Sequence, residues 1–209
     1  MAIAYDASSG GHTATTTNLT WSHTCTGTNR ILFVGYRCSV SGAVSGITYN
    51  GVAMTFIAQG GDNSSSYLGL WYLINPATGS NTVSITLSSA FISGISASYT
   101  GAKQSSQPDS SNTRTASGTT SGNISTTIVV NNSWTVAISK AASSAITGGV
   151  NSTNRAQGDN NEMQFSDSNG DLSAGSKTMN MTSGANAFWG QVIASFSPPA
   201  AGGSWFMFI

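Results

Sequence analysis

The stretch ITYNGVAMT, residues 47–55, holds a strong local folding signal. An Asn-Gly pair, Asn50-Gly51, separates two short runs of apolar and β-branched residues. Such a pair suits a type I′ turn, in which both central residues need positive φ angles. The stretch therefore predicts a tight β-hairpin.

Similar strand-like runs recur on both sides of this hairpin, separated by clusters of Gly, Ser and Asn. No segment has the length and periodicity of a helix, so the sequence predicts an all-β protein. The predicted strands are residues 2–5, 19–23, 31–38, 46–49, 52–58, 67–74, 82–87, 92–99, 124–130, 134–140, 162–165, 177–181 and 188–196.

The two halves of the chain share a residue pattern. Ala-Gln-Gly occurs at residues 58–60 and again at 156–158, and Ala-Ser-aromatic occurs at 97–99 and again at 194–196. Five short strands with one apolar face must bury that face against a second layer. We therefore expect the halves, about residues 29–100 and 123–197, to pack on each other. The result is one antiparallel β-sandwich domain, residues 1–197, of jelly-roll or Greek-key type, although two separate five-stranded domains are the alternative.

Two segments fall outside the strand pattern. Residues 101–122 are polar, contain Pro108 and lack apolar periodicity, so they are expected to form the connection between the halves. Residues 198–209 form a C-terminal apolar arm after Pro198-Pro199, because proline cannot donate a hydrogen bond to a sheet.

Charge is unusually scarce. Charged residues make up 7% of the 209 residues and the net charge is zero, whereas a typical soluble domain has roughly 25% charged residues. Scattered Lys and Arg argue against nucleic acid and acidic membranes as partners. No apolar run reaches the ~18 residues of a membrane span, and the N-terminal residues do not resemble a signal peptide. These features suit a virion component assembled in a host cytosol, or a secreted protein whose signal peptide has been removed.

The cysteines, Cys25 and Cys38, are expected to be free, buried thiols. If residues 26–29 form a turn between paired strands, Cys25 lies opposite about position 30. Cys38 would then lie beyond the ~7 Å Cα separation that a disulfide allows.

Catalytic signals are weak. The histidines are His12 and His23, and neither belongs to a nucleophile or metal motif. Glu162 with an aspartate is the carboxylate pair of a glycoside hydrolase in principle, but residues 159–162 (DNNE) are more simply a polar turn. We expect no enzymatic activity.

One segment has the spacing of a calcium loop. In SDSNGDLS, Asp167, Asn169 and Asp171 alternate around a glycine, which would direct their oxygens at a single Ca²⁺ ion. A hairpin turn uses the same residue types, and the bidentate glutamate of a full calcium loop is missing. Calcium is the one cofactor the sequence suggests.

Four tryptophans, Trp21, Trp71, Trp134 and Trp189, could stack on sugar rings if a sheet exposed them. Three of them, Trp71, Trp134 and Trp189, lie inside the strongest strand patterns, where packing in the core is the simpler interpretation.

The chain ends in five consecutive large apolar residues, which would be prone to aggregation if they were left in water. We expect these residues to form an assembly contact with another virion protein or a second copy of the chain, although folding back onto their own domain is the alternative. They are Trp205, Phe206, Met207, Phe208 and Ile209.

The run ITYNGVAMTFIAQGG…LGLWYLINPATGSNTVSITLS, residues 47–88, resembles a β-sandwich module of tailed-phage virion proteins and uncharacterised bacterial surface proteins. The closing strand, residues 188–196, followed by prolines is similar as well. The resemblance implies display or binding and brings no catalytic residues. The expected function is a non-enzymatic virion structural protein, such as a capsid decoration, fibre or auxiliary protein, at the virion surface. The alternative is an extracellular module that binds carbohydrate, such as a cell-surface glycan, or a host receptor.

Overall fold

The structure, a computed structural model, describes residues 2–200, and every regular element in this range is a β-strand. No helix that could span a membrane occurs among these residues. The first half contains β1 (Ala4–Cys25), β2 (Ile31–Cys38), β3 (Val44–Tyr49), β4 (Val52–Ala53), β5 (Thr55–Gly61), β6 (Tyr67–Ile74) and β7 (Gly79–Thr100). The second half contains β8 (Ser110–Ile128), β9 (Trp134–Ala141), β10 (Ile146–Gly148), β11 (Thr153–Gly158), β12 (Met163–Asp167) and β13 (Gly175–Phe196).

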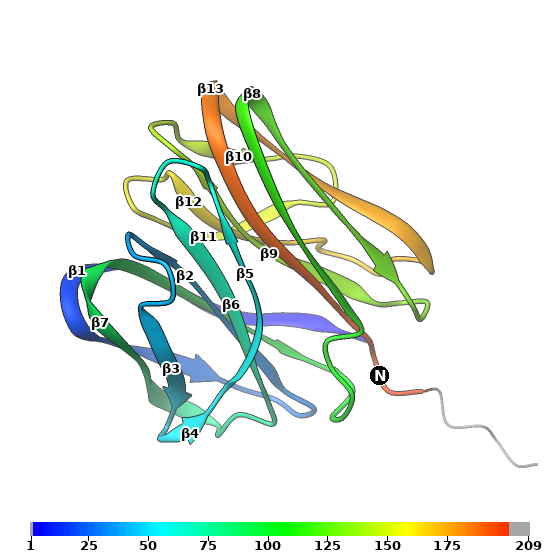
Figure 1. Cartoon of the computed structure of the whole chain (residues 1–209). Helices are drawn as coiled ribbons and strands as arrows, with labels where there is room; N and C mark the ends of the chain where they lie inside the picture. Colours follow the sequence, from blue (N-terminus) through cyan, green and yellow to red (C-terminus); the bar gives the residue numbers. More distant parts are fainter. Residues whose placement is uncertain (1, 201–209) are drawn as a thin grey trace, which may run out of the picture.

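Each half forms its own antiparallel sheet, and the two sheets pack together as a sandwich (Figure 1). The first sheet has the order β4-β3-β7-β2-β6-β5, with β1 paired to β7. The second has the order β10-β13-β9-β12-β11, with β8 paired to β13. Apart from β4 the two orders match strand for strand. The structure therefore confirms the all-β sandwich and the repeat, while the jelly-roll or Greek-key connectivity stays a prediction.

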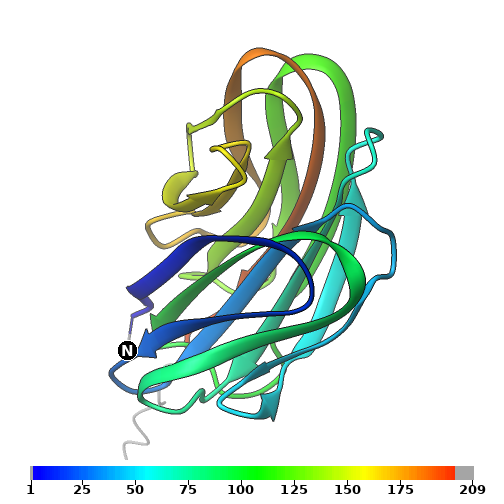
Figure 2. The ribbon, with the colours of Figure 1, turned by 90° about the vertical axis from the view of Figure 1, so that its left-hand side faces the viewer.

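Each half is bordered by a long, bent two-stranded ribbon. Strands β1, β7 and β13 have 22 residues each and β8 has 19, whereas ordinary strands have about 5–6. The ribbons β1–β7 and β8–β13 arch over their own halves (Figure 2). The predictions of separate strands at 82–87 and 92–99, and at 177–181 and 188–196, were therefore wrong. In β7 the apolar alternation changes phase at the bend, which made one strand resemble two.

The polar connection predicted at residues 101–122 is shorter than expected. Strand β8 already begins at Ser110, and it pairs with β13 over almost its whole length. Strand β1 likewise starts at Ala4 and includes the Ser/Thr-rich stretch before residue 19. Both were missed for one reason. Alternating Ser, Thr and Gly carry no apolar signal, and backbone hydrogen bonding to the neighbouring strand decides their conformation.

The two halves share a core between the sheets. Positions that correspond in the two strand orders contribute to it in pairs, such as Phe33 with Val136 and Ala97 with Ala194. Its buried members are Ile3, Ile31, Phe33, Leu68, Leu70, Ile95, Ala97, Tyr99, Ala102, Trp134, Val136, Ile138, Met163, Phe165, Val192, Ala194 and Phe196. Burial of this much apolar surface holds the halves together as one unit.

Each half also has a separate core of its own beneath the arched ribbon. In the first half it includes Leu32, Val34 and Trp21, and in the second Ile193 and Trp189. Strands β2 and β9 lie between the shared core and these outer cores, so both of their faces are buried. This double burial explains the nearly continuous apolar run of residues 31–38.

One close contact between the halves joins two corresponding positions, Gly35 of β2 and Ile138 of β9. A Cβ atom added to Gly35 would lie 3.0 Å from Ile138 Cδ1. Strand β1 contacts β11, and its counterpart β8 contacts β5, the counterpart of β11. Ser8 of β1 donates to the Arg155 carbonyl of β11 (2.8 Å), and Thr115 of β8 donates to the Gly61 carbonyl of β5 (2.7 Å). The halves therefore meet as the two subunits of a twofold dimer do.

Two local predictions are confirmed, one of them with a correction. Asn50 and Gly51 have φ angles of 50° and 75°, and β3 pairs with β4 across them, as a type I′ hairpin requires. Cys25 and Cys38 are free and buried. The pairing assumed for them was wrong, because β1 and β2 both pair with β7 and not with each other.

Replacing Gly35 by isoleucine, the residue at the corresponding position of β9, should destabilise the protein. The new side chain would collide with Ile138, and overpacking of this kind costs about 1–3 kcal/mol of unfolding free energy, measurable by urea denaturation. Gly46→Ile in β3 is the matched control, because a Cβ atom there meets nothing within 4 Å. Equal stability of the two variants would contradict the close packing of the halves.

Candidate functional site

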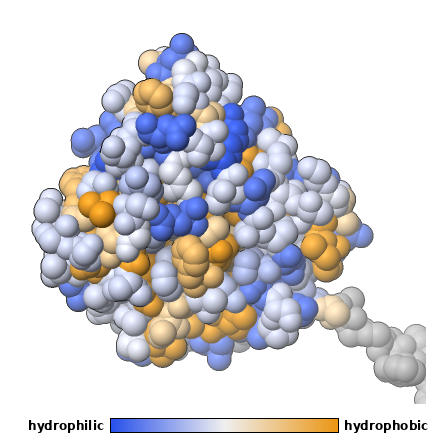
Figure 3. Space-filling view, in the orientation of Figure 1, coloured by the Kyte–Doolittle hydropathy of each residue, from blue (hydrophilic) through white to orange (hydrophobic). Residues whose placement is uncertain are grey.

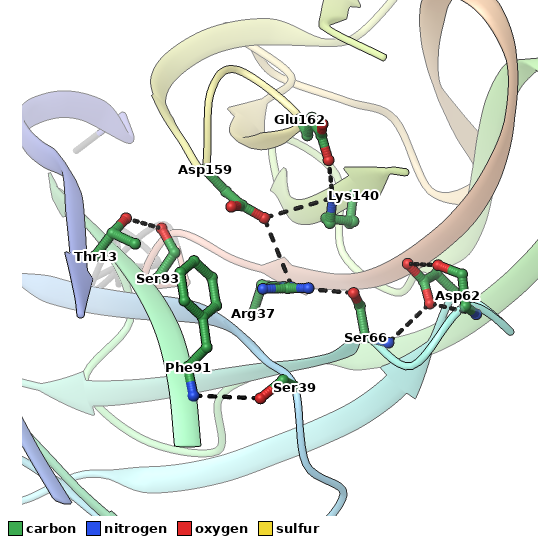
Figure 4. A network of polar contacts seen from close by, with 11 residues as sticks. Thr13, Arg37, Ser39, Asp62, Ser66, Phe91, Ser93, Lys140, Asp159 and Glu162 are labelled. Carbon is green, nitrogen blue, oxygen red and sulfur yellow. Dashed lines mark hydrogen bonds and ion pairs between the residues drawn. The ribbon is translucent and has the colours of Figure 1, made fainter. Parts of the chain in front are cut away.

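Four charged side chains gather at one end of the shared core. Arg37 of β2 and Lys140 of β9 both point toward Asp159, and Glu162 contacts Lys140 from the other side (Figure 4). The Arg37 Nε–Asp159 Oδ2 distance is 3.6 Å and the Lys140 Nζ–Asp159 Oδ2 distance is 3.4 Å. Only 3% of the Lys140 side chain is exposed, and a buried ammonium requires such partners. We call these four residues the charge cluster.

Each half supplies one cation to the cluster from the same place. Arg37 and Lys140 are the seventh residues of β2 and β9. The sequence analysis did not identify either residue. Aligning residues 31–38 with residues 134–141 as part of the repeat would have placed Arg37 opposite Lys140. Asp159 and Glu162 lie in the turn between β11 and β12, which confirms the polar turn predicted there.

Two hollows flank this turn. The Phe188 hollow has a volume of about 440 Å³, and the Phe91 hollow has a volume of about 430 Å³. The Phe188 hollow is lined chiefly by Arg37, Ser66, Lys140, Glu162, Asn186 and Phe188. The Phe91 hollow is lined chiefly by Thr13, Phe91, Gln157, Asp159, Asn160 and Asn161. The charge cluster therefore lies between two openings, each with one phenylalanine and several polar groups.

The hollows and the chain ends lie at opposite poles of the shared core. Tyr99 and Phe196 pair with the first residues of β2 and β9, whereas the charge cluster lies near the last residues of these strands. The separation along β2 is roughly 20 Å at the usual rise per residue. A third hollow of about 460 Å³ is lined by Ala2, Val130, Pro198 and their neighbours. We call this the chain-end pole, and the pole of the charge cluster the distal pole.

The buried histidine, His23, lies in a hydrogen-bond network under the β1–β7 ribbon. His23 is 1% exposed. Its Nε2 lies 3.0 Å from Ser98 Oγ, which donates to Asp6 Oδ2, and its Nδ1 lies 3.0 Å from Ser96 Oγ. Trp21 in turn donates to Ser96. This pattern assigns the neutral ring its proton on Nε2.

The second half repeats this network without a histidine. Ser195 has the place of Ser98 in the repeat, and its hydroxyl lies 2.9 Å from Ser110, which also lies 2.7 Å from Thr126. Because both halves have such a network at the same place, we assign it a structural role. Its polar groups lie under the ribbon and form hydrogen bonds with one another. His12 is elsewhere, stacked on Trp21 with a centroid distance of 5.1 Å.

The predicted calcium ligands are occupied by protein donors. Asp167 is fully buried and accepts hydrogen bonds from Arg155 Nε (2.7 Å) and from the Tyr99 hydroxyl of the other half (2.8 Å). Asn169 accepts from Arg155, and Asp171 accepts from the Trp134 indole. The Asp167 and Asn169 oxygens thus share Arg155 as a donor, and the Asp171 oxygen is bonded to Trp134. Within residues 2–200 no group of three His, Cys, Asp or Glu side chains could hold a metal ion.

Charge and burial adjust the groups around Asp167. Burial, reinforced by the Asp167 charge, raises the pKa of Tyr99 well above its ordinary value. Desolvation lowers the pKa of Arg155, but the hydrogen bond and charge of Asp167 outweigh it, so that this pKa is raised. Tyr99 therefore stays a donor and Arg155 a cation, and Asp167 links the two halves.

The tryptophans are core residues rather than a platform for sugars. Trp21, Trp134 and Trp189 are at most 6% exposed. Trp71 is partly buried and contacts Phe56 edge to face, with a centroid distance of 5.2 Å. The predicted assembly residues, Trp205 to Ile209, lie outside the described part of the chain.

Comparison with known proteins identifies no relative. The sequence matches no protein-family model, and neither the curated proteins nor the solved structures include a significant match.

Stability should fall in acid because of His23. Burial lowers its pKa from 6.5 to about 4, against an opposing effect of Asp6. Between these pH values the unfolded chain binds more protons than the folded chain, so the unfolding free energy decreases as the pH falls, by about 3 kcal/mol in all. Urea denaturation from pH 7 to pH 4 measures this. His23→Gln should remove this component and His12→Gln should keep most of it, whereas the reverse would contradict the assignment.

Asp167→Asn should destabilise the protein by about 3–5 kcal/mol, because it leaves Arg155 without its buried anion. Asp171→Asn is the matched control, since Asp171 is exposed and its oxygen toward Trp134 is retained. Thermal unfolding of the parent should not depend on added calcium or a chelator. A calcium-dependent stabilisation that both variants abolish would establish the metal site instead.

Proposed function

We propose that this protein is a non-enzymatic structural protein of a virus particle, of the decoration, fibre or auxiliary kind found in tailed phages. It attaches at the chain-end pole to another virion protein or to copies of itself, and it displays the distal pole. The proposal is carried by one observation: both ends of the described chain lie at one pole, while the charge cluster and its hollows lie at the other.

The surface supports this role. Four of the protein's fourteen charged residues neutralise one another in the charge cluster, and the surface is largely neutral and rich in hydroxyl groups. On the face drawn in Figure 3, hydrophobic residues form separate patches among polar ones. At the chain-end pole, Val129 and Val130 are 60% and 45% exposed, beside the hollow that Pro198 lines. Exposed apolar residues beside a chain end suit a contact with a neighbouring protein.

The resemblance of residues 47–88 to modules of phage virion proteins favours the same role. The location that follows is the virion surface, or the extracellular space if the resemblance to bacterial surface proteins is the closer one. A carbohydrate- or receptor-binding role is compatible with attachment, since the displayed pole holds the hollows.

A chain truncated after Pro199 should fold but lose assembly, because the apolar residues at 205–209 are removed. Size by light scattering and incorporation into particles released by lysis compare it with the full chain. Val130→Asp should also reduce incorporation, whereas Val150→Asp, at a 68% exposed valine between β10 and β11, should not. Assembly of the truncated chain at the parent's level would disprove attachment through this pole.

A further inference from the structure

Because the chain is a repeat, the surroundings of Phe188 can be compared with those of the corresponding residue in the first half. Its counterpart in the first half is Phe91, whose carbonyl accepts from Ser39 N at 3.0 Å, as the Phe188 carbonyl accepts from Ala142 N at 2.9 Å. Over the Phe91 ring lies the guanidinium of Arg37, 4.7 Å from the ring centroid. In the first half, therefore, one face of this aromatic ring lies against the cation of the neighbouring strand β2.

Among residues 2–200 no cation lies over the ring of Phe188 in this way. Lys140, which corresponds to Arg37, is directed instead toward Asp159 and Glu162. Phe188 is 44% exposed and lines the hollow of about 440 Å³. Phe188 therefore lies at the edge of its hollow without the cation that lies over Phe91. Its ring offers a flat apolar surface to a ligand.

The polar groups around the ring define the chemistry of that ligand. Glu162 offers a carboxylate, Asn186 an amide, Ser143 a hydroxyl and Arg37 a guanidinium, all on the lining of the hollow. These groups both donate and accept hydrogen bonds. The two cations and two anions of the charge cluster cancel, so the hollow does not favour a charged ligand over a neutral one.

We propose that the Phe188 hollow binds a neutral saccharide. The C–H face of a pyranose ring lies on Phe188, and its hydroxyls bond to Glu162, Asn186 and Ser143. A neutral sugar combines an apolar face with closely spaced donors and acceptors, which matches both features of the hollow. The site is at the distal pole and does not depend on attachment to a particle.

The test uses the isolated full-length protein. An array of neutral glycans, covering hexoses, pentoses and N-acetylhexosamines, identifies a binder, and a backbone-amide NMR titration with that sugar locates it. We expect saturable shifts at Ser143, Asn186 and Phe188. Phe188→Ala should weaken binding roughly tenfold or more, and Glu162→Gln should weaken it as well.

Phe56→Ala is the matched control, because Phe56 is 47% exposed on β5, outside the residues lining the hollow. It should bind the sugar as the parent does. Three results would overturn the proposal: no neutral glycan binds, only acidic glycans bind, or Phe188→Ala binds as tightly as the parent. Each is measured without particles, so it is separable from failure of the assembly experiment.

Discussion

The structure depends on the close packing of its two halves, which brings Gly35 of β2 against Ile138 of β9 in the shared core. Gly35 and Ile138 hold the same position in the two halves and contact each other. Isoleucine at both positions would not fit, because the two side chains would occupy the same space. The chain places a large side chain on one strand and none on the other. Both sheets can then approach closely enough for the paired apolar residues on either side to exclude water.

This arrangement also determines where charge resides. Strands β2 and β9 are buried on both faces, so a charged residue near their ends must find a partner inside the protein. Arg37 and Lys140 meet at Asp159, and Asp167 joins Arg155 of its own half to Tyr99 of the other. The charge cluster is a consequence of the packing of the halves, and the hollows beside it are the openings that this packing leaves at the distal pole.

Much of the fold was predictable, because strands with a buried face carry an apolar pattern. Residues 31–38 and 67–74 were predicted with the bounds observed for β2 and β6. Strand β8 was not, since its Ser- and Thr-rich alternation resembles a loop and its conformation comes from pairing with β13. The calcium interpretation of Asp167 followed correct local spacing, but Arg155, twelve residues earlier, and Tyr99, in the other half, already occupy its carboxylate.

The sequence by itself determined the all-β class, the hairpin at Asn50-Gly51 and the repeat, because each depends on local residue patterns or on correspondence along the chain. Only the tertiary structure decided which groups meet. Lys140 and Arg37 are over a hundred positions apart in the chain. Arg37 lies over Phe91, whereas Lys140, at the corresponding position, is directed toward Asp159 and Glu162. Such differences arise from how two similar halves pack face to face, where side chains at corresponding positions cannot all make the same contacts.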